Sequence, residues 1–230
     1  MIRIIGDIHG NVFQHNGRCW CDNPQCVGRS YNNIVRDAEY SIQLGDLSLK
    51  YDYLNAIADP NRHKVVGGNH DNMDDLPKFE HYLGDFGTLE LGGLDFFFIR
   101  GGLSVDKEYR VNRVSWWEEE ELGYKESCKC IKLFGPTKPE IVVSHDCPMT
   151  CYYGGVLTNP TKKDGSQTAR LLESCLNAWQ PKMWFFGHHH KNWVEKIGRT
   201  TFVCLNELCY VDVDETIVDK SPDEIRSMIV

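Results

Sequence analysis

The chain has 230 residues, enough to bury a full hydrophobic core within one α/β domain. Its formal net charge at pH 7 is −8, and no stretch is dense in Lys and Arg. Sequence-independent nucleic-acid binding is therefore not expected, because Lys and Arg contacts to phosphate supply most of that affinity. Met1 leads directly into an apolar run without a signal peptide, and no apolar run is long enough to span a membrane, so we expect a cytoplasmic protein.

Five short apolar runs are typical of buried strands, and Gly follows directly after four of them. The runs are Ile2–Ile5 and residues 42–44, 65–66, 141–143 and 184–186. Polar residues that can bind metal stand just beyond the runs: Asp7, His9, Asp46, Asn69, His145, His188 and His190. Because ligands gather beyond the carboxyl ends of the strands in open α/β sheets, we expect these side chains to share one sheet edge.

The first half of the chain alternates strand patterns with helical ones. Residues 51–58 carry a helical pattern. Residues 88–91 and Leu94–Ile99 flank two glycines, which predicts a β-hairpin. Residues 116–122 then predict a short acidic helix.

The second half predicts two helices and two more strands. Ser166 is expected to cap a helix over residues 167–179, where apolar residues recur at helical spacing. Strands are predicted at residues 201–205 and 208–213. Ser221 begins a capping-box sequence with Pro in the first turn, so the chain is expected to end as a helix.

The polar residues form five ordered blocks. These are Asp7-x-His9, Gly45-Asp46, Gly68-Asn69-His70-Asp71, His145 and Gly187-His188-x-His190. Over residues 7–190 this order resembles the calcineurin-like metallophosphoesterase superfamily. The resemblance implies an α/β fold in which two facing mixed β-sheets are flanked by helices, as a four-layer αββα sandwich. It also implies that residues 1–230 form a single metallophosphoesterase domain.

The family pattern implies a site with two divalent metal ions. It assigns the first metal to Asp7, His9 and His190, the second to Asn69, His145 and His188, and the bridging position to Asp46. Imidazole and carboxylate ligands suit Mn, Fe, Zn or Ni, and we favour Mn²⁺. Such paired metals lie roughly 3.5–4 Å apart and lower the pKa of bound water. The site therefore suits phosphoester hydrolysis with a metal-bridging hydroxide as the nucleophile.

His70 is the block member that the family pattern does not assign to a metal. In the resembling family this residue faces the substrate and protonates the departing oxygen as a general acid. Histidine suits that role because its pKa lies near neutrality, although His70 could instead only fill its loop. Asp71 could orient the His70 imidazole as its catalytic partner, and a simple turn residue is the alternative.

Substrate contacts are sought among the remaining polar residues. Arg100 is the first candidate for the substrate phosphate, because a guanidinium group donates two parallel hydrogen bonds. Arg110 and Arg113 follow, and a surface salt bridge is the alternative for each. His189 is a further candidate substrate contact, although its side chain could point elsewhere. Asp146 is expected to accept the outer N–H of a ligating imidazole.

The chain departs from the protein Ser/Thr phosphatases of this superfamily. Those enzymes continue after the Gly-Asp pair with Asp-Arg-Gly, whereas this chain continues from Asp46 with Leu-Ser-Leu-Lys. The difference favours a smaller prokaryotic or bacteriophage-type phosphoesterase acting on a small phosphorylated or nucleotide substrate. The preference for monoesters or diesters is left open. A protein phosphatase, a nuclease and a non-catalytic interaction scaffold of the same fold are the alternatives.

The ten cysteines occupy two kinds of surroundings. Five lie in or beside apolar segments and are expected to be reduced core residues: Cys147, Cys151, Cys175, Cys204 and Cys209. The others could hold an additional structural Zn²⁺: Cys19, Cys21, Cys26, Cys128 and Cys130. Loose thiols on a surface loop are the alternative for this second set.

Overall fold

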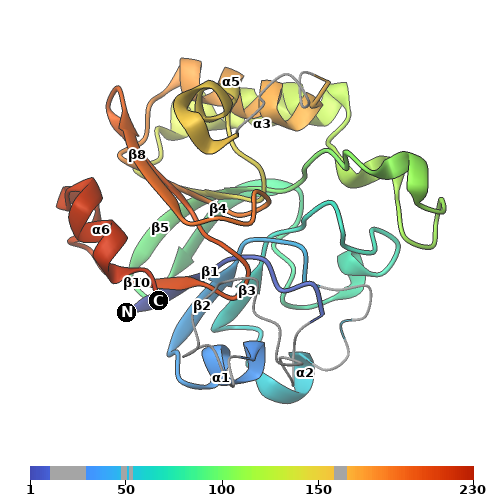
Figure 1. Ribbon diagram of the computed structural model, residues 1–230, viewed down its shortest axis with the longest axis horizontal. Helices are drawn as coiled ribbons and strands as arrows, with labels where there is room; N and C mark the ends of the chain where they lie inside the picture. Colours follow the sequence, from blue (N-terminus) through green and yellow to red (C-terminus); the bar gives the residue numbers. More distant parts are fainter. Residues whose placement is uncertain (11–29, 48–50, 52–53, 158–164) are drawn as a thin grey trace.

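Two β-sheets face each other at the centre of the molecule (Figure 1). The computed structural model describes residues 1–10, 30–47, 51, 54–157 and 165–230. One sheet has the strand order β10-β1-β2-β3, and the other has the order β4-β5-β6-β7-β9-β8. Helices lie on the outer face of each sheet, so the expected α/β sandwich of two facing mixed sheets is confirmed.

The parallel strands bring their carboxyl ends to a common edge of each sheet. The four-stranded sheet contains β1 (Ile2–Ile5), β2 (Tyr40–Gln43), β3 (His63–Val65) and β10 (Tyr210–Val213). The six-stranded sheet contains β4 (Phe86–Leu91), β5 (Leu94–Ile99), β6 (Ile141–Ser144), β7 (Met183–Phe186), β8 (Trp193–Ile197) and β9 (Thr200–Cys204). β1, β2 and β3 run parallel, as do β5, β6, β7 and β9. All five predicted apolar runs overlap these parallel strands.

The helices lie on the outer faces of the two sheets, except the last of them, which lies at the side of the sandwich against β8 and β10. They are α1 (Tyr31–Arg36), α2 (Leu54–Ile57), α3 (Tyr124–Thr137), α4 (Met149–Cys151), α5 (Gln167–Ala178) and α6 (Pro222–Met228). In Figure 1, α3 and α5 cover the six-stranded sheet, while α1 and α2 lie against the outer face of the four-stranded sheet. The site loops are thus held between two rigid sheets, each of which is backed by helices.

Strand β5 shows how the sequence fills these layers. Successive side chains of a strand point to opposite faces. Phe96 and Phe98 belong to the core between the sheets, whereas Phe97 and Ile99 pack with Phe134 of α3 beneath the helical layer. Both faces of β5 are therefore buried, which explains why its sequence is almost continuously apolar.

The predicted hairpin between β4 and β5 is confirmed. The strands pair antiparallel, with Leu91 opposite Leu94. Gly92 and Gly93 between them have φ values of 56° and 83°, and tight hairpin turns of this kind need positive φ at both positions. Strand β8, which pairs antiparallel with β9, was not predicted from the sequence.

Two of the predicted helix caps are confirmed. The Ser166 side chain accepts a hydrogen bond from the Ala169 backbone at the start of α5. Ser221 and Glu224 form a reciprocal capping box at the start of α6. The predicted strands at 201–205 and 208–213 correspond to β9 and β10.

Two helix predictions need correction. The acidic segment 116–122 forms only a 3₁₀ turn at Glu118–Glu120, because the Glu120 carboxylate turns inward to bind Ser104. Such tertiary contacts override local helix propensity. The helix expected at 51–58 is described only as α2, and residues 52–53 lie outside the described part of the chain. The 14-residue helix α3 was not predicted.

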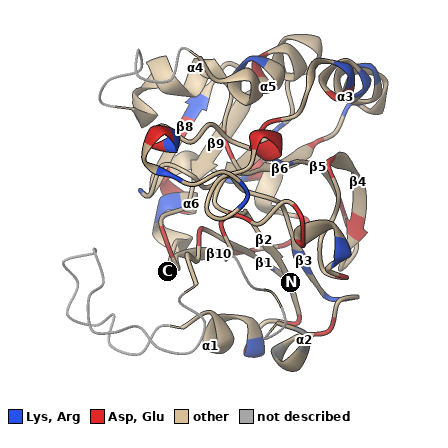
Figure 2. Cartoon of the chain, turned by 90° about the vertical axis from the view of Figure 1, so that its right-hand side faces the viewer, with Lys and Arg blue, Asp and Glu red and all other residues tan. Residues whose placement is uncertain are grey.

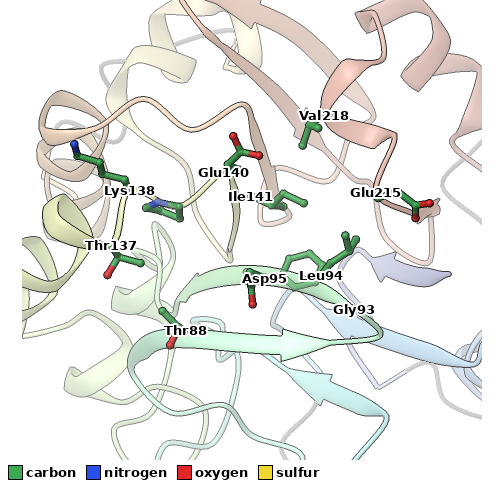
Figure 3. A pocket seen from close by; sticks show the side chains of 12 residues that line it. Thr88, Gly93, Leu94, Asp95, Thr137, Lys138, Glu140, Ile141, Glu215 and Val218 are labelled. Carbon is green, nitrogen blue, oxygen red and sulfur yellow. The ribbon is translucent and has the colours of Figure 1, made fainter.

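A cavity of about 630 Å³ lies at the opposite end of the strands from the histidine-rich loops (Figure 3). Its wall includes Leu94 and Ile141, the first residues of β5 and β6, together with Glu140 and Glu215. In the view of Figure 2, basic and acidic residues are interspersed along the chain, without a continuous basic stripe on the described residues. None of the described helices is long and apolar enough to cross a membrane.

Candidate metal centre

The loops after β1, β2 and β7 bring four metal-binding side chains together. One ligand atom from each of Asp7, His9, Asp46 and His190 lies within 4.8 Å of the others. The Nε2 atoms of His9 and His190 are 2.9 Å apart, and the His190 Nε2 is 3.1 Å from Asp7 Oδ2. A single proton cannot satisfy two ring nitrogens and two carboxylates that converge on one point. A divalent cation can, so this donor set fits a metal.

A second group shares Asp46 with the first. It contains ligand atoms of Asp46, His145 and His188, again within 4.8 Å of one another. The His145 Nδ1 lies 2.7 Å from the carbonyl oxygen of Leu44, which can only accept, so Nδ1 carries the hydrogen. In the neutral ring, the His145 Nε2 is then a lone-pair donor.

That lone pair faces further acceptors. The His145 Nε2 is 2.9 Å from Asn69 Oδ1 and 3.3 Å from Asp46 Oδ1. A divalent cation placed among these three atoms could be coordinated by all of them. The structure therefore brings all seven predicted ligands into two adjoining groups, and the chemistry of both groups suits divalent metals.

The charges of the first group are strongly perturbed. Burial by itself raises the pKa of Asp7, but the close contact with His190 and the neighbouring imidazoles of His9 and His145 outweigh it and hold the pKa well below its ordinary value. Burial also opposes a charge on His9, yet the carboxylates of Asp7 at 3.8 Å and Asp46 at 3.7 Å raise its pKa to about 9. The raised pKa of His9 reflects the negative charges of Asp7 and Asp46, which would equally favour a bound cation.

The backbone is strained at this edge. His9, Asp46, His188 and His190 have φ values of 48°, 55°, 65° and 48°, although none is glycine. Left-handed backbone costs about 1–2 kcal/mol per residue for L-amino acids and clusters at functional sites. Gly187 is also required, because a Cβ there would lie 2.2 Å from Asp7 Oδ1. The carboxylate of Asp7 is thus held directly against the loop that carries His188.

Asp71 binds the backbone of the site loops. Its carboxylate accepts hydrogen bonds from the backbone N–H groups of Asp46 at 3.0 Å, Leu47 at 2.9 Å and Gly68 at 2.8 Å. The side chain is completely buried. Asp71 therefore ties the loop after β2 to the loop after β3, and its role as the orienting partner of His70 stays a prediction.

His70 lies beside the two groups and next to Arg110. Its backbone N–H donates to Asp46 Oδ1 at 2.7 Å, and Arg110 Nη2 lies against both ring nitrogens, 2.7 Å from Nδ1 and closer to Nε2. Burial lowers the pKa of His70 to about 4, and the positive charges of Arg110 and His9 contribute, while Asp46 acts in the opposite direction. The free side chain is therefore neutral near pH 7.

The two other predicted substrate contacts are not where they were expected. Arg100 donates from Nε to Asp85 Oδ1 and from Nη1 to the carbonyl oxygen of Glu119, both at 2.6 Å. The His189 side chain is only 1% exposed, and its Nε2 lies 3.0 Å from Asp146 Oδ1. Arg100 thus connects Asp85 with the backbone of Glu119, and the His189 side chain is part of the protein interior.

Asp146 binds the loop after β7 through His189. Its Oδ2 accepts from the Tyr152 hydroxyl at 2.7 Å and lies 3.9 Å from His188 Nε2, beyond hydrogen-bond distance. The nearer imidazole is that of His189, which also approaches Cys147 Sγ at 3.4 Å. Burial raises the pKa of the Cys147 thiol well above its ordinary value. This trio is therefore a closed hydrogen-bonded network with a protonated thiol.

The proposed structural zinc finds no support among the described cysteines. Cys19, Cys21 and Cys26 lie outside the described residues. Cys130 is buried in the core and contacts Cys175 of α5, whereas Cys128 is half-buried on α3. Helical residues two apart do not face each other, so these two thiols do not point to a common metal. The five cysteines of the apolar segments are buried, as expected.

Sequence reasoning missed two residues that contact the site. Ser104 accepts a hydrogen bond from Asn69 Nδ2 at 2.9 Å, and Glu120 binds Ser104. Neither lies in a recognisable block. The sequence shows only a run of four acidic residues, which is normally a solvated surface. That Glu120 is buried is visible only in the structure.

The chain belongs to the calcineurin-like phosphoesterase family, whose model matches residues 1–192. This is a family of phosphoester hydrolases that typically bind divalent metals. No curated protein sequence matches the chain. A solved structure of a candidate 5′-nucleotidase from Staphylococcus aureus has a TM-score of 0.54 at 12% identity, covering 93% of this chain and 51% of that one.

A second solved structure is the phosphopantetheinyl hydrolase PptH of Mycobacterium tuberculosis. It has a TM-score of 0.47 at 13% identity, with 90% of this chain and 89% of that one covered. The chain spans about half the length of the S. aureus protein. At such low identity, the likeness to that protein shows the fold alone.

Proposed function

We propose that this protein is a dinuclear metal-dependent phosphoesterase that hydrolyses a small phosphorylated or nucleotide substrate. The observation that carries the proposal is the pair of donor groups that share Asp46. Asp7, His9 and His190 would hold the first metal, Asn69, His145 and His188 the second, and Asp46 would contribute to both groups. When bound, two divalent ions supply Lewis-acid activation of the attacking water and neutralise phosphate charge.

His70 is the proposed general acid. Its backbone bond to Asp46 holds it beside the bridging carboxylate, where a departing oxygen would emerge. A general acid must carry a proton in the substrate complex, whereas burial and Arg110 keep the free side chain neutral. A phosphate anion bound next to Arg110 offsets that positive charge, so substrate binding itself favours protonation of His70.

Arg110 replaces Arg100 as the proposed phosphate contact. Asp106 Oδ2 accepts from its Nε at 2.9 Å, and the carbonyl oxygen of Ser115 accepts from its Nη1 at 3.3 Å. These two bonds leave Nη2 directed at His70. The side chain is 9% exposed, so the guanidinium is already held in place before a phosphate arrives.

The segment that carries Arg110 also exposes apolar side chains. Val105, Tyr109, Val111 and Val114 are all exposed on this segment. Exposed apolar groups beside a charged site suit the organic part of a substrate. This supports a small organic phosphoester or nucleotide, in which the phosphate binds at Arg110 and the organic group contacts the neighbouring surface.

The test is hydrolysis of p-nitrophenyl phosphate and bis-p-nitrophenyl phosphate by metal-stripped protein resupplied with Mn²⁺, Zn²⁺ or Fe²⁺. We expect metal-dependent turnover that Asp46→Asn reduces to background. Asp95→Asn, an exposed carboxylate beside the cavity in Figure 3, is the matched control and is expected to keep the wild-type rate. The better substrate distinguishes a phosphatase from a phosphodiesterase.

The negative outcomes separate the alternatives. A protein that binds two metals and hydrolyses neither ester, nor a panel of nucleotides, would support a non-catalytic scaffold. A protein that binds no divalent metal would contradict the central assignment.

A further inference from the structure

Asn69 can serve as a metal ligand only in one of its two amide orientations. Its carbonyl oxygen has lone pairs for a metal, whereas its amide nitrogen carries two hydrogens and presents them as donors. A half-turn about the last side-chain bond exchanges the two. The residue is 2% exposed, with Nδ2 bound to Ser104 Oγ and Oδ1 facing His145 Nε2. Some contact must therefore hold the amide in this orientation.

Ser104 alone could not do so, because a hydroxyl group can donate as well as accept. Whether the Ser104 hydroxyl donates to Asn69 or accepts from it depends on Glu120. The Ser104 hydroxyl donates to Glu120 Oε2 at 2.5 Å, and the Ser104 backbone N–H donates to Glu120 Oε1 at 2.9 Å. An oxygen–oxygen distance of about 2.5–2.7 Å is typical of a hydroxyl bound to an ionised carboxylate.

Once its hydrogen points to Glu120, the Ser104 oxygen can only accept. It then favours the NH₂ group of Asn69 and repels the carbonyl oxygen. Ser104 and Glu120 are both buried, at 2% and 3% exposure, so water does not easily replace these bonds.

We propose that Glu120 and Ser104 are positioning residues for the metal bound by Asn69, His145 and His188, and that they act by holding the Asn69 carbonyl oxygen toward it. This inference rests on the metal-binding part of the proposed function. Neither residue reaches the metal position itself. Their effect is transmitted through one amide group, so it is specific to one of the two metals.

The test is calorimetric titration of metal-free protein with Mn²⁺. We expect two binding steps in the wild type. Ser104→Ala and Glu120→Gln are each expected to weaken one step by about 10- to 100-fold and leave the other unchanged. Glu120→Gln is informative even if Ser104→Ala folds poorly, because glutamine keeps the size but cannot accept both hydrogens in the same way. Ser104→Thr retains the hydroxyl and should restore wild-type binding.

Ser41→Ala is the matched control. It removes from β2 a hydroxyl group that is as buried as that of Ser104. This hydroxyl is hydrogen-bonded to His63 Nδ1 at 2.9 Å and not to a proposed metal ligand. Both binding steps should stay unchanged. Urea unfolding in the presence of a chelator shows whether each variant is folded before metal is added.

A double-mutant cycle with Asn69→Ala separates positioning from a general structural effect. Asn69→Ala should weaken the same step, and adding Ser104→Ala should then cause no further loss, because the two act through one ligand. Additive losses, or wild-type binding by Ser104→Ala and Glu120→Gln, would overturn the inference. If the wild type binds both metals but hydrolyses no ester, the proposed catalysis fails while these binding results still decide the inference.

Discussion

Arg110 Nη2 lies against both ring nitrogens of His70, 2.7 Å from Nδ1 and closer to Nε2, although the two residues are 40 positions apart in the chain. The contact places a charged donor beside the only histidine of the five blocks that is assigned to proton transfer. Because Asp106 and Ser115 hold the other guanidinium nitrogens, the arrangement is rigid before substrate arrives. In the proposed function, this contact would link phosphate recognition to the protonation of His70.

Removing Arg110 should weaken substrate binding and transition-state stabilisation. We expect Arg110→Ala to lower kcat/KM by about 10- to 100-fold, because hydrogen bonds to charged groups contribute about 1.5–3 kcal/mol. Arg113→Ala is the control, since Arg113 pairs with Asp74 and Glu119 at the surface. Steady-state kinetics on the better substrate measure both. Equal losses in the two variants would argue against a phosphate contact at Arg110.

Removing His70 should have an effect that depends on the leaving group. An alkyl phosphoester needs a proton on its departing oxygen, whereas p-nitrophenolate leaves readily without one. We therefore expect His70→Ala to slow an alkyl ester by about 10²–10⁴-fold and a p-nitrophenyl ester much less. Metal content of the variant should match the wild type. A loss of the same size for both esters would point to a role other than proton donation.

Asp71 should matter for stability rather than for proton transfer. Asp71→Asn keeps the shape but removes a buried acceptor from three backbone N–H groups. We expect the free energy of unfolding to fall by on the order of 3 kcal/mol, because these backbone N–H groups lose their hydrogen bonds to a charged acceptor. Asp75→Asn, which breaks an exposed pair with Lys78, should change it by less than about 0.5 kcal/mol. Urea unfolding of metal-free protein compares them.

Stability should decline at mildly acidic pH because of His63. Burial, and then the charge of His81, lower the pKa of His63 from 6.5 to about 4 in the folded protein. Above pH 6.5 the imidazole is neutral in both states, and the full stability is present. As the pH falls from 6.5 to about 4, His63 binds a proton in the unfolded chain but stays neutral in the folded protein. The free energy of unfolding therefore decreases over this range.

The His63→Gln variant isolates this contribution. Between pH 6.5 and 4.5 the wild type should lose up to about 1.4 kcal/mol per pH unit more than His63→Gln, measured by urea unfolding in chelator. Parallel pH profiles for the two proteins would show that His63 titrates normally in the folded state.

The sequence by itself determined the strands and the set of residues at the site. Each apolar run is a local signal, and the Gly after most of them ends the strand where a polar loop begins. Parallel strands align their carboxyl ends, so Asp7, Asp46 and His188 were expected at one sheet edge. Instead, Asp7 and Asp46 follow strands of the four-stranded sheet and His188 follows β7 of the six-stranded sheet, and the site lies where the carboxyl ends of the two sheets meet. The two helix caps could also be predicted because they are local signals, in which each cap involves residues three apart in the chain.

Only the tertiary structure decided what the side chains around those ligands contact. Arg100 and Arg110 are indistinguishable in sequence, yet Asp85 binds the first and the second reaches His70. His189 stands between two site residues, but it turns inward to Asp146, 43 positions away. Ser104 and Glu120 became part of the site because the chain folds back on itself after β5.

The physical reason is that these directions depend on backbone angles and on partners distant in the chain. A left-handed residue such as Asp46 or His188 redirects its side chain in a way that no periodic pattern records. Burial then removes the alternatives, because a polar group deprived of water must take the partner that the folded chain provides. Local pattern thus selects which residues reach the site edge, and packing between distant segments selects what each of them does there.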